Sequence, residues 1–341
     1  MDSKSYHQGL DDTLRCVRGA ISAKLLLSAL EQDVFTDLDT PKSLAAISAR
    51  HGWQTAATEK FCEILSHLGL VVMRAGTVRN TERTSRLFSK HSEDNIGAFV
   101  LESCRWCLHP LDDLPRVLRQ GAKPPEHETN PEATWHELTA NGAGVVLASG
   151  GAIMAEYLAA LPGARRYRRM LDLGGGHGGY ALRAAEAMPW MEVDVLDFPA
   201  VLQVAERFRE KSPAKDRVRM LPANYVTEPI PGGYDLVLVS ATLNFTLADN
   251  ATQNVMDKIH AALNPGGFCV SVHDGPVDEK LMPEWPFECL VTDLVTGTPM
   301  AMPAGLVANT MFASGFSHVR TEYLRLNGSL MTVDVGRKSN L

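Results

Sequence analysis

The sequence predicts an α/β protein in which a helical N-terminal part precedes a mostly parallel sheet. Two observations lead to this fold class. From residue 169 onward, short apolar runs that read as strands alternate with amphipathic helices, as in doubly wound sheets. A glycine-rich turn at 174–179 separates the first strand from its helix, and Asn327 with Gly328 closes the chain in an antiparallel hairpin.

The composition is that of an ordinary globular protein. The chain has 341 residues, 45% of them hydrophobic and 21% charged, with a net charge of −7. This length allows two domains. The acidic balance gives no electrostatic footprint for nucleic acid, and we expect no apolar run to approach the length that spans a bilayer. No signal-peptide pattern opens the chain, so we expect a cytoplasmic protein without a membrane or nucleic-acid partner.

The cysteines do not form a metal or redox pattern. Cys104 and Cys107 have C-x-x-C spacing, but no second pair follows to complete a zinc site. Scattered cysteines of this kind are usually buried apolar residues. We therefore expect no metal centre.

The first part of the chain reads as helices followed by a small hairpin. Apolar residues recur at helical spacing over 10–30, 43–50 and 58–68, and residues 70–79 form two short strands. This order is typical of a winged helix, which can bind DNA. Residues 58–67, at the place of a recognition helix, offer one lysine against two glutamates, whereas phosphate contacts need several cations.

The middle of the chain connects two predicted domains. Residues 96–118 read as a helix, 121–131 as a loop, and 134–161 as a helix interrupted by glycines. The predicted regions are a winged-helix or helical domain at 1–120, a linker with a helix at 121–165, and an α/β domain at 166–341.

The α/β domain has a regular alternation of elements. Strands are predicted at 170–173, 192–196, 217–221, 234–240 and 267–273, and helices at 179–187, 199–209 and 251–263. Such alternation implies a Rossmann-like, mostly parallel sheet with helices on both faces. Two final strands at 318–326 and 330–336 flank the Asn-Gly turn and close the sheet with an antiparallel hairpin.

The glycine turn carries the ligand prediction. Gly174, Gly176 and Gly179 fit a dinucleotide fingerprint, but Asp172 before them would repel a pyrophosphate and suits a cationic group. Asp197, at the end of the next strand, can accept both hydroxyls of a ribose. Two acids around a glycine turn indicate a nucleoside with a positively charged amino-acid tail, which is S-adenosylmethionine.

These segments resemble the class I S-adenosylmethionine-dependent methyltransferases. More narrowly, residues 171–178, 196–201 and 263–267 are similar to motifs of the O-methyltransferase family with a winged-helix dimerisation domain. The resemblance implies a small-molecule acceptor. It also implies a homodimer in which the N-terminal domain covers the partner's acceptor site, with the linker helix contributing to that site.

The cofactor should lie beyond the carboxyl ends of the strands. Asp172, Gly174 and Gly176 would hold its methionine part and Asp197 its ribose. The remaining expected contacts are Phe198 on the adenine, Asn224 on the adenine amino group and Ser240 on the cofactor tail.

Position 244 departs from the resembling family. There the family has a histidine that deprotonates the acceptor hydroxyl, whereas this chain has Asn244, which cannot act as a base at neutral pH. Either another residue, such as His273 or His109, supplies the base, or the acceptor has no proton to lose. In both cases Asn244 is left with a positioning role.

A thioether sulfur is an acceptor of the second kind, because it attacks with a lone pair. The chain thereby resembles the methylthiohydroxybutyrate S-methyltransferases of dimethylsulfoniopropionate synthesis. Its sulfonium product would be stabilised by aromatic faces. The residues expected to line the acceptor pocket are Trp106, Met154, Tyr157, Phe245, Trp285, Met300 and Met302.

Two alternatives stay open. One is an O- or C-methyltransferase on an aromatic or natural-product acceptor, with His273 or His109 as base. The other is a non-catalytic regulator that binds S-adenosylmethionine and uses the winged helix on DNA.

Overall fold

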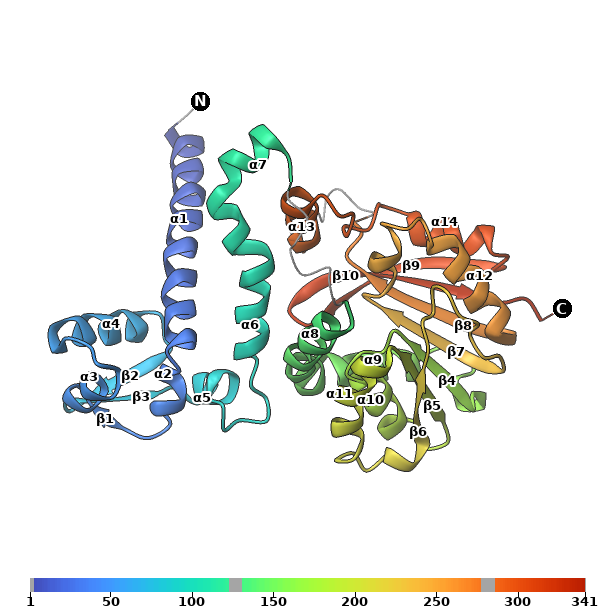
Figure 1. Cartoon of the computed structure of the whole chain (residues 1–341), viewed down its shortest axis with the longest axis horizontal. Helices are drawn as coiled ribbons and strands as arrows, with labels where there is room; N and C mark the ends of the chain where they lie inside the picture. The colour runs from blue at the N-terminus through green and yellow to red at the C-terminus, as the bar shows by residue number, and fades with distance from the viewer. Residues whose placement is uncertain (1–2, 123–130, 277–285, 341) are drawn as a thin grey trace. The chain divides into compact units, whose positions relative to one another are not determined.

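The computed structural model describes residues 3–122, 131–276 and 286–340. The chain divides into two compact units, residues 1–102 and 103–341 (Figure 1). This division falls earlier than the predicted boundary at residue 120, and the roles assigned to the regions stay predictions. The elements of the first unit are α1 (Ser3–Glu31), α2 (Val34–Asp37), β1 (Lys42–Ser43), α3 (Leu44–His51), α4 (Thr55–His67), β2 (Val71–Arg74), β3 (Thr77–Asn80), α5 (Glu82–Phe88) and α6 (Gly97–Ser103).

The first unit is a helical cluster with a small antiparallel sheet of order β1-β3-β2. Ser43 begins α3 by accepting a hydrogen bond from the backbone N–H of Ala46, and Gly52 ends that helix at a φ of 68°. The expected helices and hairpin are thus present. The apolar side chains that hold the unit together include Phe35, Leu38, Ile47, Cys62, Leu65, Val71 and Val78.

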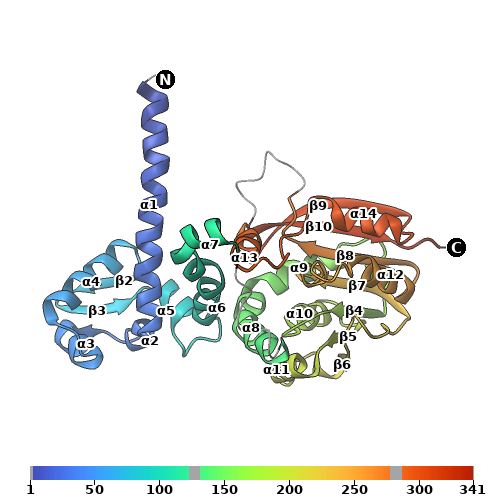
Figure 2. The same ribbon diagram turned by 45° about the horizontal axis from the view of Figure 1, so that its top comes forward.

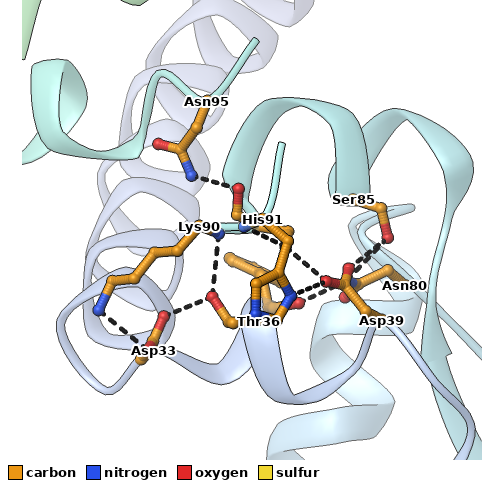
Figure 3. A network of polar contacts seen from close by, with 10 residues as sticks. Asp33, Thr36, Asp39, Asn80, Ser85, Lys90, His91 and Asn95 are labelled. Atoms are coloured by element: carbon orange, nitrogen blue, oxygen red, sulfur yellow. Dashed lines mark hydrogen bonds and ion pairs between the residues drawn. The ribbon is translucent and has the colours of Figure 1, made fainter. Parts of the chain in front are cut away.

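A polar network ties the end of α2 to β3, to α5 and to the segment after α5 (Figure 3). The Asp39 carboxylate accepts hydrogen bonds from Asn80 at 3.2 Å, Ser85 at 2.9 Å and Ser89 at 2.5 Å, and lies 3.0 Å from Nδ1 of His91. One carboxylate therefore joins elements 40 to 50 residues apart in the sequence.

The second unit contains a seven-stranded sheet of order β6-β5-β4-β7-β8-β10-β9. Strands β4 to β8 are parallel, and β10 pairs antiparallel with both β8 and β9. The predicted closing hairpin is confirmed. The strands are β4 (Arg169–Leu173), β5 (Glu192–Asp197), β6 (Val218–Pro222), β7 (Tyr234–Ser240), β8 (Leu263–His273), β9 (His318–Leu326) and β10 (Ser329–Arg337).

Helices cover both faces of this sheet (Figure 1). Side chains along β4 alternate between the two faces of the sheet. Met170 belongs to the same buried cluster as Met154 and Leu182 on one face. Leu171 belongs to the cluster on the other face, which includes Ile259. Buried apolar clusters lie on both faces, as is usual for parallel strands covered by helices. The helices are α7 (Leu114–Gln120), α8 (Pro131–Val145), α9 (Gly151–Ala159), α10 (Gly179–Ala187), α11 (Pro199–Arg209), α12 (Thr252–Ala262), α13 (Glu288–Thr296) and α14 (Leu306–Ala313).

Two predicted helices are not regular. The helix expected over 96–118 breaks into α6, a π-turn η1 (Cys104–Leu108), a 3₁₀ turn η2 (His109–Asp113) and α7. Pro110 and Pro115 lack the N–H groups that a continuous helix needs. The helix over 134–161 contains a π-turn, η4 (Val146–Gly150).

One helical run, Trp135–Ala159, is long and apolar enough to cross a membrane by length and composition. The expectation that no run approaches that length is therefore corrected. The second half of the run packs in the core, where Met154 and Leu158 are fully buried. A core helix passes the same test.

Candidate active site at the carboxyl ends of the strands

The glycine turn follows β4 and lies against the end of β7. Gly174, Gly176 and Gly178 have φ values of 63°, 56° and 69°, which favour glycine. A Cβ added at Gly174 would lie 2.3 Å from Cγ2 of Thr242. The Thr242 hydroxyl lies 3.3 Å from the carbonyl oxygens of both Leu173 and Gly174. The positive φ values and the close approach of Thr242 therefore favour glycine in this bend, which leaves its backbone without side chains.

Asp172 is a buried acid directly beneath the turn. It is 1% exposed, and burial raises the pKa of its carboxyl to about 7, although the backbone N–H of Ala181 donates to it. Its Oδ2 has no hydrogen-bond partner among the residues that the structure describes. A buried carboxylate with one oxygen left without a partner among those residues, beside a glycine turn, fits a cationic ligand group.

Asp197 joins the turn to the end of β5. Its Oδ2 accepts a hydrogen bond from the Gly176 N–H at 2.9 Å, and its Oδ1 accepts one from the Phe198 N–H at 2.8 Å. Burial raises the pKa of this carboxyl. The half-buried Phe198 follows at the start of α11. The structure thus brings the two acids and the glycines of the turn together.

Two further expected cofactor contacts lie at neighbouring strand ends. The amide oxygen of Asn224, after β6, accepts from the backbone N–H groups of Val226 at 2.9 Å and Thr227 at 3.3 Å. Ser240, the last residue of β7, hydrogen-bonds the Tyr180 hydroxyl. Both residues therefore lie at the expected edge of the sheet, each with a local structural partner.

The run α8–η4 covers the turn, and sequence reasoning missed two of its residues. Thr139 lies 3.5 Å from the position that a Cβ of Gly176 would take. The Trp135 ring packs on the Phe245 ring in a T-shape with centroids 4.3 Å apart. Neither residue has a motif, so only the fold could reveal them.

Asn244 is 5% exposed and lies in η7 (Leu243–Thr246), just beyond β7. Its Nδ2 donates to Oδ1 of Asp274 at 2.7 Å and to the carbonyl oxygen of Met300 at 2.7 Å. Both amide hydrogens are used in this way. The side chain therefore ties three segments together and offers no basic atom.

His273 has no ring nitrogen available for an acceptor. It is 1% exposed; its Nδ1 accepts from the Gly275 N–H at 3.1 Å, and its Nε2 lies 2.8 Å from Oδ2 of Asp334. With Nδ1 as acceptor, the proton sits on Nε2 and points to Asp334. His109 lies exposed at the start of η2. The geometry gives His273 a structural place and not that of a free base.

The predicted pocket residues fall into different places. Met154 is fully buried in the core, and the Tyr157 hydroxyl donates to Glu322 on β9 at 2.6 Å. These two hold α9 on the sheet, a packing role that periodicity alone could not separate from a lining role. Trp106 is half-buried in η1 and Met302 is a buried residue of the loop after α13, whereas Trp285 lies outside the described residues. Met300 and Phe245 are brought to Asn244.

Comparisons with known proteins show which proteins the chain is similar to. Residues 147–300 match the family model of the O-methyltransferase domain. The chain is 35% identical over 103 residues to demethylspheroidene O-methyltransferase of Rhodobacter capsulatus, covering 30% of this chain but only 24% of that protein. It is 26% identical to the N,N-dimethyltransferase OxyT of Streptomyces rimosus, over 73% of each chain. Human N-acetylserotonin methyltransferase in complex with S-adenosylmethionine shares the fold, with a TM-score of 0.77, 21% identity, and coverage of 99% of this chain and 100% of that one.

The fold and the matches define a class I S-adenosylmethionine-dependent methyltransferase. The part of the chain that matches the O-methyltransferase domain model is residues 147–300. The orphaned carboxylate of Asp172 and the bare glycine turn fit a cofactor that carries an ammonium group.

Proposed function

We propose that this enzyme methylates an acceptor that attacks with a lone pair, specifically the thioether sulfur of a small methylthio acid. 4-Methylthio-2-hydroxybutyrate, the acceptor in dimethylsulfoniopropionate synthesis, is the candidate. The main support for this proposal is the side-chain amide of Asn244, which donates hydrogen bonds to Asp274 and to the carbonyl oxygen of Met300. Asn244 itself offers no base to an acceptor beside it, and a nucleophile that needs no deprotonation fits such a site.

The cofactor contacts belong to the same proposal. Asp172, Gly174 and Gly176 hold the methionine part, Asp197 the ribose, and Phe198, Asn224 and Ser240 the adenine end and tail. When bound, S-adenosylmethionine supplies a methyl group on a sulfonium. The chain's own contribution is alignment of the two sulfur centres and exclusion of water.

The aromatic pair Trp135–Phe245 supports a sulfonium product. Phe245 follows Asn244 directly, and its ring packs against Trp135. Aromatic faces attract cations that lack hydrogen-bond donors. The acceptor's carboxylate needs a cation; Arg105, whose Nη1 lies 3.6 Å from a Glu137 carboxylate oxygen on the surface of the same unit, is the candidate.

A second candidate is O- or C-methylation of an aromatic or natural-product acceptor. The O-methyltransferase domain and the naphthoate 3-O-methyltransferase of Streptomyces sahachiroi, 25% identical over 77% of this chain, favour it. This reading needs a base, and the engagement of both His273 nitrogens speaks against that residue.

The N-terminal unit supports a homodimer. Tyr6, Leu10, Leu14, Val17 and Ile21 recur at helical spacing on α1 and are 37–61% exposed. Figure 2 shows the N-terminal half of α1 projecting beyond α3, α4, β2 and β3 of its own unit. We propose that a second copy of the chain covers this stripe, because a continuous apolar face on a monomer is unfavourable in water.

An acceptor panel tests the proposed reaction. Purified enzyme is given S-adenosylmethionine with 4-methylthio-2-hydroxybutyrate, 3-methylthiopropionate, a catechol or an aromatic amine, and release of S-adenosylhomocysteine is followed. We expect the thioethers to turn over fastest. Turnover of phenols alone would contradict the proposal and favour the second candidate.

A further inference from the structure

The segment between α13 and α14 is held by side chains and not by regular secondary structure. Its backbone N–H groups at Met300 and Ala301 both point to Asp293, with Oδ1 at 2.6 Å from Met300 N and at 3.2 Å from Ala301 N. The second oxygen of Asp293 lies 3.3 Å from Ala301 N. One carboxylate thus receives two consecutive peptide groups.

The same peptide is held from its other side. The carbonyl oxygen of Met300 accepts from Nδ2 of Asn244, and Met302 N donates to Oδ1 of Asp274 at 3.4 Å. Asp274 also accepts from Asn244 and hydrogen-bonds the Cys289 thiol of α13. The backbone of residues 300–302 is therefore hydrogen-bonded by three side chains: Asn244 of η7, Asp293 of α13, and Asp274 just after β8.

These three side chains are positioned by different elements. Asn244 and Asp274 follow the parallel strands, so their positions are set by the sheet. Asp293 lies on α13, whose last turn ends at Gly297 with a φ of 75°. Asp293 therefore fixes the direction in which the chain leaves α13 and arrives at Asn244. Charge-assisted hydrogen bonds of this kind are stronger than neutral ones.

We propose that Asp293 is a positioning residue that determines acceptor specificity. It holds Met300, whose side chain is half-buried, as a wall of the acceptor site beside Asn244. The inference rests on the proposed position of the acceptor at Asn244. It does not depend on whether that acceptor is a thioether.

The test uses the full chain with Asp293→Ala and Asp293→Asn. Asparagine keeps one acceptor oxygen for Met300 N, whereas alanine keeps none. Asp257→Asn is the matched control, because Asp257 on α12 also accepts two hydrogen bonds, from Gln253 at 2.8 Å and Ser314 at 2.6 Å, away from this segment.

The first readout is hydrogen exchange of a peptide covering 298–303, with S-adenosylhomocysteine affinity measured beside it. In Asp293→Ala we expect exchange to accelerate about tenfold or more, with an intermediate effect in Asp293→Asn and none in the control. The affinity for S-adenosylhomocysteine should stay within about twofold, because the hydrogen bonds described for residues 300–302 go to Asn244, Asp293 and Asp274 and not to the glycine turn. Unchanged exchange in Asp293→Ala would overturn the proposal.

The second readout is kinetic and uses whichever panel acceptor the wild type methylates fastest. We expect the KM for that acceptor to rise about tenfold in Asp293→Ala while the KM for S-adenosylmethionine is kept. Equal KM values for the acceptor would overturn the proposal. If thioethers fail but another acceptor shows the shift, the proposed reaction is wrong and the role of Asp293 stands.

Discussion

At position 244 an amide stands where the resembling O-methyltransferases have a histidine. The structure gives this exchange a physical meaning, because both hydrogens of the Asn244 amide are used to hold Asp274 and the Met300 peptide. Asparagine donates and accepts but does not take up a proton at neutral pH. Asn244 can therefore hold its neighbours in position, but it cannot take a proton from an acceptor.

Asn244→His should give the site a base. Asp274 already lies 2.7 Å from the amide nitrogen and can orient an imidazole in its place. We expect methylation of a catechol acceptor to rise by about 10²-fold, within the usual range for a general base. The melting temperature should fall, because the two hydrogen bonds of the amide are lost. Asn244→Gln is the control without a base, and a catechol rate equal to that of the control would refute the argument.

The pH dependence of cofactor binding should report Asp172. Burial raises the pKa of its carboxyl to about 7, so the apo site is protonated below that pH. An ammonium ligand favours the ionised form, and affinity should therefore rise with pH by up to about tenfold per unit until about pH 7 and then level off. Calorimetry with S-adenosylhomocysteine from pH 5 to 8 measures this. In Asp172→Asn the profile should be flat and binding weaker; a flat wild-type profile would contradict the assignment.

The folded apo protein has the opposite trend from the same group. The pKa of the Asp172 carboxyl is near 7 in the folded protein and lower in the unfolded chain. The contribution of this group to stability is therefore fully present below the unfolded pKa and is lost as pH rises through the folded pKa near 7. Ligand-free enzyme should therefore lose stability over the pH range in which binding improves.

At the scale of elements, short polar anchors hold segments that have no sheet partner. Asp293 holds the loop after α13, and Asp39 holds the segment after α5 (Figure 3). Buried backbone groups need partners, and in loops a carboxylate can serve several donors at once. Breaks in helices have an equally local cause, as Pro110 shows in η2.

Asp39→Ala should destabilise the N-terminal unit. Burial acts to raise the pKa of Asp39, but hydrogen bonds from Ser89, His91 and Ser85 outweigh it, and the pKa is lowered. Removing the carboxylate leaves the buried Ser89 hydroxyl without this acceptor, at a cost of about 1–3 kcal/mol, whereas the exposed His91 can bond to water instead. Thermal unfolding followed by circular dichroism measures the loss.

The wild-type contribution of Asp39 should be present above the ordinary carboxyl pKa and vanish as pH falls through the lowered one. Asp39→Asn should remove this acid-dependent part. Equal acid sensitivity in both proteins would show that Asp39 is not its source.

At the scale of the whole molecule, the apolar stripe on α1 stays exposed to solvent in a single chain. Val17→Asp or Ile21→Asp, at positions 52% and 57% exposed, should leave the fold of the unit intact. A carboxylate at the centre of an apolar interface is costly, so the dimer should dissociate. Sedimentation velocity measures the mass.

Gln8→Asp adds the same charge on the opposite face of α1 and should leave the dimer in place. A wild-type chain that sediments as a monomer, or stripe variants that stay dimeric, would count against the proposed interface.

Much of the fold could be predicted because its causes are local. The apolar runs of β4 to β8, the glycines at 174–178 and the Asn327 turn each constrain their own backbone, and the structure has these elements where the patterns place them. The site was harder to predict. Asp172, Asp197 and Asn244 stood out by their positions at or near the carboxyl end of a strand, but Trp135, Thr139 and Asp293 carry no such signal.

The sequence by itself determined the alternating sheet, the glycine bend that we propose for the cofactor, and the lack of a basic side chain at position 244. Only the tertiary structure decided that His273 is engaged by Asp334, that Met154 and Tyr157 pack the sheet, and that Asp293 meets Met300. The physical reason is how far apart in the sequence the interacting residues are. Propensity and backbone strain act between neighbours in the chain, whereas a hydrogen bond between distant segments exists only once burial has brought them together.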